Sequence, residues 1–158
     1  MFDFDQFNDL ILKPTLTDLL LCSDKAIQLM AFTCANESQG GRFLRQIQGP
    51  ALGIYQMEPR TYNDLWENYI SKKPNIVMIL THHFNAPVMQ DEARLIYDLR
   101  YATAMTRLYY AKFFEPLPEI GDLDALWAYY KKYYNTSEGK ANKIAALNAY
   151  HLFRFGRV

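Results

Sequence analysis

Apolar residues recur every three or four positions along most of this chain, which is the spacing of one face of an α-helix. The pattern is clear over residues 24–36, where Ile27, Met30 and Cys34 fall on a single stripe. One further turn of the same stripe reaches Glu37. We therefore expect a helix whose buried face ends at a carboxyl group, so that this carboxyl lies at the edge of the core.

The same periodicity, read together with caps and prolines, predicts further helices. Ser23 is a suitable N-cap for the helix just described, and Pro59 suits the first turn of a later helix. Pro14 is expected to end the first helix, and the glycine-rich residues 40–53 are expected to form a loop. One apolar run, residues 75–81, also fits a strand, although we favour a helix. The expected helices cover residues 3–12, 15–22, 24–36, 60–70, 75–81, 91–114, 122–133 and 140–153.

Length and composition favour a single folded unit. The chain has 158 residues and half of them are apolar, which is enough to bury a hydrophobic core without metal or disulfide support. We therefore predict one mostly α domain over residues 1–158, with at most a small sheet. The two cysteines, Cys22 and Cys34, belong to no C-x-x-C pair, and we expect both to be buried thiols.

Charge and hydropathy exclude several classes of protein. The formal net charge is zero, which argues against a nucleic-acid partner, because such proteins usually present a basic face. The N-terminus lacks the basic start and apolar core of a signal peptide, and no apolar stretch approaches the ~20 residues of a membrane span. We expect a protein that is made in the cytoplasm and does not insert into a membrane.

The strongest candidate for chemistry is the carboxyl of Glu37. It is followed by Ser38, and Gly53 opens a second segment, Gly-Ile-Tyr-Gln-Met-Glu-Pro, that ends at Pro59. Cleavage of a glycosidic bond needs a protonated carboxyl beside the bridging oxygen. A glutamate in a partly apolar pocket supplies one, because desolvation disfavours the charged form. The alternative is a solvated glutamate in the last turn of a helix, with no chemical role.

These two segments resemble the lytic transglycosylase family, which shares its fold with goose-type lysozymes. Members carry a Glu-Ser pair at the end of a helix and, further along, a Gly-[Leu/Ile]-x-Gln-x-x-Pro segment. Here the pair is Glu37-Ser38 and the segment is residues 53–59. The compact size and the missing signal peptide look like the bacteriophage branch. The resemblance implies a lysozyme-like domain of two helical lobes with a central cleft.

A third family element, Tyr-Asn followed by glycine, is matched by Tyr134-Asn135 with an insertion before the glycine. Tyr129 is a competing match that lacks the asparagine. By this resemblance, the hydroxyl of Tyr134, or alternatively that of Tyr129, holds the carboxyl of Glu37. Asn135 is expected to shape the turn behind it.

The resemblance also implies roles for the remaining candidates. Glu37 is expected to act first as the general acid and then as the general base. Ser38 and Gln56 are expected to hydrogen-bond the glycan. Tyr55 and Tyr101 are candidate platforms for sugar rings, because flat aromatic faces cover the apolar sides of pyranoses.

The activity implied is cleavage of the β-1,4 bond between N-acetylmuramic acid and N-acetylglucosamine in peptidoglycan strands, by a monomer that needs no cofactor. A two-carboxylate hydrolase needs a partner acid. Glu58 and Asp64 are the nearest candidates, but neither spacing compels that role, which favours a transglycosylase. Adjacent histidines, His82 and His83, point to different sides of most backbones, so no metal site is expected.

Two alternatives remain open. One is a hydrolytic muramidase on the same fold, and the other is a phage structural protein that keeps the scaffold without activity. In either catalytic case, a protein made in the host cytoplasm would reach the cell wall through a holin or as part of a virion.

Overall fold

The chain folds into a mostly helical domain, as the sequence predicts. The computed structural model describes residues 1–135 and 142–156. In this part of the chain, β-structure is limited to two isolated bridges, Arg45 with Leu52 and Leu52 with Met57. In place of the small sheet that the sequence allows, the described residues thus contain only these short bridges within the segment 45–57.

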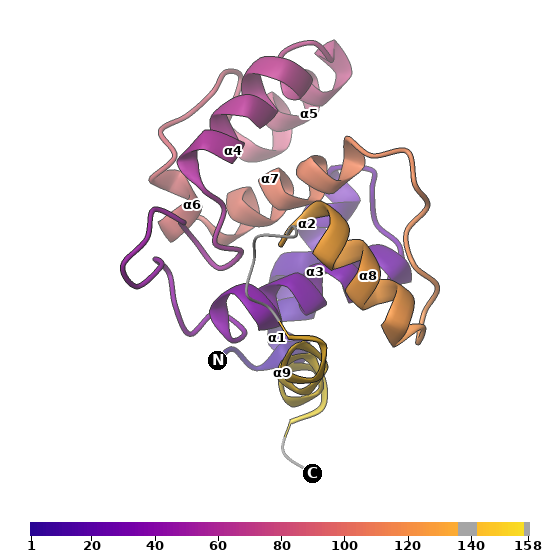
Figure 1. Cartoon of the computed structure of the whole chain (residues 1–158). Helices are drawn as coiled ribbons and strands as arrows, with labels where there is room; N and C mark the ends of the chain where they lie inside the picture. The colour runs from indigo at the N-terminus through magenta and orange to yellow at the C-terminus, as the bar shows by residue number, and fades with distance from the viewer. Residues whose placement is uncertain (136–141, 157–158) are drawn as a thin grey trace.

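The helices form two groups that are joined by α7 (Figure 1). One group contains α4 and α5, and the other contains the N-terminal helices, α3, α8 and α9. The bounds are α1 Phe4–Phe7, the π-helix η1 Asn8–Leu12, α2 Lys13–Asp18, α3 Asp24–Ser38, α4 Pro59–Leu65, the π-helix η2 Trp66–Ile70, α5 Pro74–Phe84, α6 Arg94–Tyr97, α7 Leu99–Ala111, α8 Leu123–Tyr133 and α9 Lys143–Phe155.

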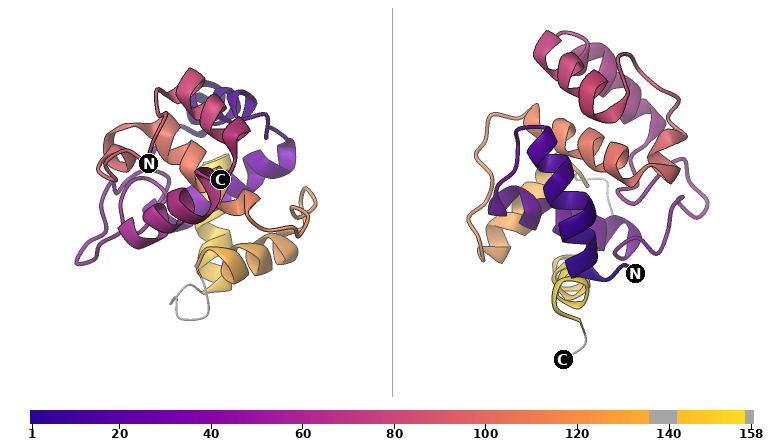
Figure 2. Two further views of the ribbon diagram at one scale, coloured as in Figure 1. Left: turned by 90° about the horizontal axis from the view of Figure 1, so that it is seen from above. Right: turned by 180° about the vertical axis from the view of Figure 1, so that it is seen from behind.

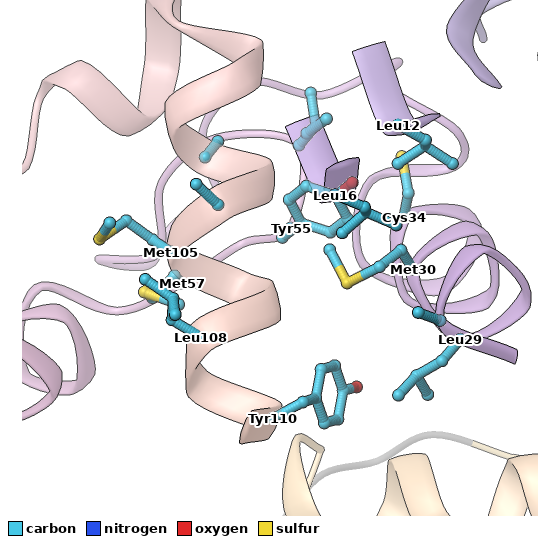
Figure 3. Packing of buried hydrophobic residues seen from close by; sticks show 14 of the residues in the cluster. Leu12, Leu16, Leu29, Met30, Cys34, Tyr55, Met57, Met105, Leu108 and Tyr110 are labelled. Carbon is cyan, nitrogen blue, oxygen red and sulfur yellow. The ribbon is translucent and has the colours of Figure 1, made fainter. Parts of the chain in front are cut away.

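Helix α3 lies at the centre of the larger group. It packs against α9, α7 and α8, and views from above and behind show these helices surrounding it (Figure 2). Its side chains Leu29, Met30 and Cys34 face the same interior as Leu16 of α2 and Tyr110 of α7 (Figure 3). Helix α3 is buried along most of its length, including Ser38 in its C-terminal turn.

A buried hydrogen-bond network joins α7 to the smaller group. The hydroxyl of Tyr101 lies 2.7 Å from the hydroxyl of Tyr62 and accepts a hydrogen bond from the Trp66 indole at 3.1 Å. The Tyr62 hydroxyl in turn donates to the main-chain carbonyl of Gln90 at 2.8 Å. Every polar atom that these rings bring into the core thus has a partner, as burial requires.

Most predicted helices are confirmed, including residues 75–81, which lie within α5 rather than in a strand. The single helix expected over residues 91–114 is wrong. The helix is interrupted at Asp98, whose backbone is extended and whose side chain accepts a hydrogen bond from the Tyr101 N–H at 2.9 Å. This N-cap starts α7 as a separate helix from α6.

Two further expectations are wrong. Pro14 does not end the first helix; η1 precedes it, and the helical path continues into α2. The wider π-turn relieves the clash that a proline ring otherwise makes with the carbonyl one turn earlier. Cys22 is exposed rather than buried, whereas Cys34 is buried as expected. In the described part of the chain, no helix combines the length and apolarity needed to cross a bilayer.

Gly53 permits the closest backbone approach near the candidate site. Its φ is +74°, and a Cβ placed there would lie 2.1 Å from the main-chain oxygen of Leu95. Only a residue without a side chain allows the segment after the loop to lie against α6.

We expect Gly53→Ala to destabilise the fold much more than Gly121→Ala. Gly121 has a similar φ of +82°, but a Cβ added there would meet only open space, so its substitution adds only backbone strain of about 1 kcal/mol. At Gly53 the same strain is joined by a clash with fixed backbone, worth roughly 2 kcal/mol more. Urea unfolding of the two variants measures the difference, and equal losses would contradict this packing.

Candidate active site

The carboxyl of Glu37 lies in the last turn of α3, where the apolar stripe ends. The helix begins with the Ser23 side chain accepting a hydrogen bond from the Ala26 N–H at 3.1 Å, and it ends at Gln39, whose φ of 53° is left-handed. The reversal at Gln39 turns the chain away directly after the glutamate. Glu37 is therefore partly buried, between the body of the helix and the segments that pack over its end.

Ser38 joins the end of α3 to the second segment that the sequence singles out. Its hydroxyl lies 2.6 Å from the carbonyl oxygen of Ile54 and accepts a hydrogen bond from the Gly41 N–H at 2.9 Å. The side chain is completely buried. The two segments do meet, but the expectation that Ser38 contacts a glycan is wrong, because its hydroxyl is enclosed by protein.

Two side chains hold the carboxyl of Glu37. The hydroxyl of Tyr130 donates a hydrogen bond to its Oε1 at 2.6 Å, and the Asn135 side chain hydrogen-bonds the same group. Burial raises the pKa of Glu37 from 4.5 to about 7, and the two hydrogen bonds oppose this rise. A glutamate with this pKa exists in both protonation states near neutral pH, which suits a group that gives and takes a proton.

Neither tyrosine expected to hold Glu37 does so. The hydroxyl of Tyr134 donates to the main-chain carbonyl of Tyr55 at 2.8 Å, and that of Tyr129 is directed to the carbonyl of Glu115 at 3.3 Å. Consecutive residues of a helix point about 100° apart, so Tyr129 and Tyr130 face different directions. Tyr134 lies about one turn beyond Tyr130 on the same side, but its hydroxyl contacts the second segment, and the residue that contacts Glu37 is Tyr130.

The sequence does contain a signal for Tyr130. Leu126 and Tyr130 are four residues apart in α8 and both are fully buried, so they mark the face of the helix that packs on the core. The Tyr130 ring also meets Phe32 of α3 edge-on, at 5.3 Å between centroids. The motif match selected the residue next to the asparagine, whereas helical periodicity selects the one on the buried face.

Asn135 has a more direct role than the sequence predicts. Besides its hydrogen bond to Glu37, its side-chain oxygen accepts a hydrogen bond from the Lys131 ammonium at 2.8 Å. The remainder of the predicted turn, residues 136–139, lies outside the described residues.

The two proposed sugar platforms are core residues. Tyr55 is 1 % exposed, with its hydroxyl 3.1 Å from that of Thr103, and Tyr101 belongs to the buried network under α4. Both predictions are wrong, because the aromatic rings face the interior. Gln56 is partly exposed, and its amide donates to the Gly53 carbonyl at 2.7 Å, which stabilises the tight turn of this segment.

Neither candidate partner acid is bound to Glu37. Asp64 pairs with the Lys112 ammonium at 3.2 Å and accepts from the Asn68 amide at 2.8 Å, and these contacts lower its pKa. Glu58 is exposed and lies immediately before α4. In the part of the chain that the structure describes, the site thus offers one carboxyl of high proton affinity, with its phenol and amide partners.

Other features of the surface lie apart from this carboxyl. Among residues 1–135 and 142–156, no cluster of three or more potential ligands could hold a metal ion, and His83 lies 3.5 Å from Asp18 instead. A surface pocket of about 520 Å³ opens between α1, the first half of α3 and α9, where Ile27 and Arg154 are among the lining residues. Glu37 is in the last turn of α3 and does not line this pocket.

No family model matches the chain, and searches of curated proteins and of solved structures likewise find no match.

We expect Glu37→Gln to become more stable relative to the parent as the pH rises. The folded pKa of about 7 lies above the ordinary 4.5, so the native state binds the proton more tightly than the unfolded chain does. This stabilisation is complete below about pH 4.5 and disappears as the pH rises through 7. The relative gain of the variant should approach roughly 3 kcal/mol, measured by calorimetric unfolding between pH 4 and 9.

Glu115→Gln is the matched control with the opposite sign. The pKa of Glu115 is lowered, chiefly by the hydrogen bond from Lys132, so the parent should gain stability over this variant as the pH rises from acid. Parallel pH profiles for the parent and Glu37→Gln would show that the carboxyl is not buried as described.

Proposed function

We propose that this protein cleaves the β-1,4 bond between N-acetylmuramic acid and N-acetylglucosamine in peptidoglycan, with Glu37 as the catalytic acid. The observation that carries the proposal is the pKa of about 7 at this carboxyl, produced by burial at the end of α3. The Glu-Ser and Gly-Ile-Tyr-Gln segments that resemble lytic transglycosylases meet at the same point, through the Ser38 hydroxyl.

The first step needs the protonated form of Glu37. At neutral pH about half of the molecules hold this proton, and its transfer to the bridging oxygen allows the sugar to leave. The carboxylate that remains is stabilised by hydrogen bonds from Tyr130 and Asn135. It then accepts a proton from the hydroxyl that attacks the anomeric carbon, which restores the acid.

Among residues 1–135 and 142–156, neither candidate partner acid is bound to Glu37, which supports a transglycosylase route. A retaining hydrolase places a second carboxyl about 5 Å from the acid, and an inverting one places it somewhat further away. Asp64 is bound to Lys112 and Asn68, and Glu58 is exposed in front of α4. The acetamido group of the substrate would then stabilise the cationic carbon, and the muramoyl 6-hydroxyl would replace water and close a 1,6-anhydro ring.

Hydrolysis by the same acid is the second candidate, since a water molecule in the place of the 6-hydroxyl would give a muramidase. Both routes assign the protein to degradation of the cell wall, in keeping with a phage protein made in the host cytoplasm and delivered by a holin or a virion. A structural protein that keeps only the scaffold would have no use for a glutamate with raised proton affinity.

We expect Glu37→Gln to lose at least a hundredfold in the rate of muropeptide release from purified peptidoglycan, because the general acid is removed. Mass spectrometry of the parent's products should show 1,6-anhydro ends, whereas reducing ends would indicate the muramidase route. Glu58→Gln is the control and should keep the parental rate. A Glu37→Gln protein as active as the parent would refute the catalytic assignment.

The pH profile of Tyr130→Phe tests the contact that holds the acid. The Tyr130 hydroxyl favours the charged form of Glu37, so its removal should raise the pKa of Glu37 by about one unit. Activity depends on the protonated form, so the alkaline limb of kcat/KM should move to higher pH. Tyr129→Phe changes the neighbouring residue, whose hydroxyl lies elsewhere, and should leave the limb in place. Identical shifts in the two variants would contradict the assignment.

A further inference from the structure

Arg107 is a buried arginine of α7 whose charge has no partner among the residues that the structure describes. Its side chain is 8 % exposed, and its Nε is buried without a hydrogen-bond acceptor. Two other arginines from this part of the chain are paired, Arg94 with Asp98 and Arg100 with Asp18. No such carboxylate pairs with Arg107 within the described ranges, 1–135 and 142–156.

The surroundings of Arg107 do not neutralise it. The titratable groups that act on the guanidinium are the phenols of Tyr129, Tyr69 and Tyr110. Burial raises the pKa of all three, so they are uncharged at physiological pH. Their hydroxyls hydrogen-bond neutral groups, two of which are main-chain carbonyls. Within the described part of the chain, this cation thus lies among aromatic side chains and is paired with no anion.

This arrangement is costly unless something else supplies the negative charge. Burial lowers the pKa of Arg107, but a guanidinium remains protonated in proteins. An unpaired buried charge is strongly unfavourable, whereas a carboxylate bound to the planar fork of donors restores both charge balance and hydrogen bonds.

A row of stacked rings links this arginine to the catalytic carboxyl. Tyr110, which borders Arg107, stacks on Tyr134 with 5.4 Å between centroids. Tyr134 stacks on Tyr130 at 6.3 Å, and Tyr130 hydrogen-bonds Glu37. Arg107 and Glu37 therefore lie at the two ends of one row of buried tyrosine rings, and Tyr110 interacts electrostatically with both.

We propose that Arg107 binds a carboxylate on the peptide stem of the murein substrate, between η2 and α8 and beside the glycan that Glu37 cleaves. This inference rests on the proposed function, which supplies a polymer whose muramic acid units carry peptides with free carboxylates.

The test uses full-length, ¹⁵N-labelled Glu37→Gln protein, which does not cleave the probe. A muropeptide with free carboxylates is added stepwise, and the arginine Nε–Hε resonances are followed by NMR. Two comparison probes are titrated separately: the same muropeptide with its carboxylates amidated, and sodium acetate. We expect the Arg107 resonance to shift with the free form. Amidation should weaken this binding at least about tenfold, as expected for a lost charge-assisted hydrogen bond.

Arg107→Met and Arg100→Met provide a matched pair on α7. Arg107→Met removes an unpaired charge, so its melting temperature should rise, while muropeptide affinity falls at least about tenfold. Arg100→Met breaks the pair with Asp18 and should lower the melting temperature without changing muropeptide affinity. If Arg107→Met fails to fold, the resonance titration still decides the question.

The outcomes are distinct. The inference would be overturned if the Arg107 resonance did not shift with the free muropeptide, or if it shifted equally with the amidated form. A resonance that shifted with acetate but not with the muropeptide would also overturn it. If the parent protein releases no muropeptides but the Arg107 resonance still distinguishes free from amidated probe, the carboxylate site stands and the proposed glycosidase activity falls.

Discussion

The hydroxyl of Ser38 is the contact on which the candidate site depends. It connects the end of α3 to the carbonyl of Ile54 and to the N–H of Gly41, so that one buried atom joins three segments of the chain. Gly53 lies beside this connection and has no side chain, which lets its backbone approach Leu95. The position of Glu37 follows, because the glutamate immediately precedes the serine that is held in place.

The chemistry of the site comes from opposing effects on one carboxyl. Burial favours the protonated form of Glu37, while the hydrogen bonds from Tyr130 and Asn135 favour the ionised form. If burial acted alone, the carboxyl would hold its proton too tightly to return to the ionised state. If the hydrogen bonds acted alone, it would have no proton to give at neutral pH. In the proposed reaction, a balance near pH 7 would let the group act as both acid and base.

The sequence predicts the parts of this protein that depend on local patterns. The apolar stripe of α3, its N-cap at Ser23 and the position of Glu37 at its end follow from helical spacing, and the structure contains all three. Prediction fails where two local signals compete and where long-range geometry decides. The break at Asp98 depends on a cap competing with a continuous apolar pattern, and the burial of Tyr55 depends on which way a loop folds.

The choice among adjacent tyrosines shows the same limit. A motif match cannot tell which of several neighbouring phenols faces α3, since that depends on how α8 is rotated about its own axis. Arg107 illustrates a different case: its burial and its lack of a counter-charge among the described residues both become apparent only in three dimensions.

The contact between Glu37 and Tyr130 joins positions 93 residues apart, and α9, which follows Tyr130 in the chain, packs closely against α3. During synthesis, α3 emerges long before the helices that cover its end. Until they arrive, the glutamate meets water and behaves as an ordinary carboxylate. In the proposed function, Glu37 would therefore become a proton donor only after the last helices have docked, so that activity would depend on completion of folding.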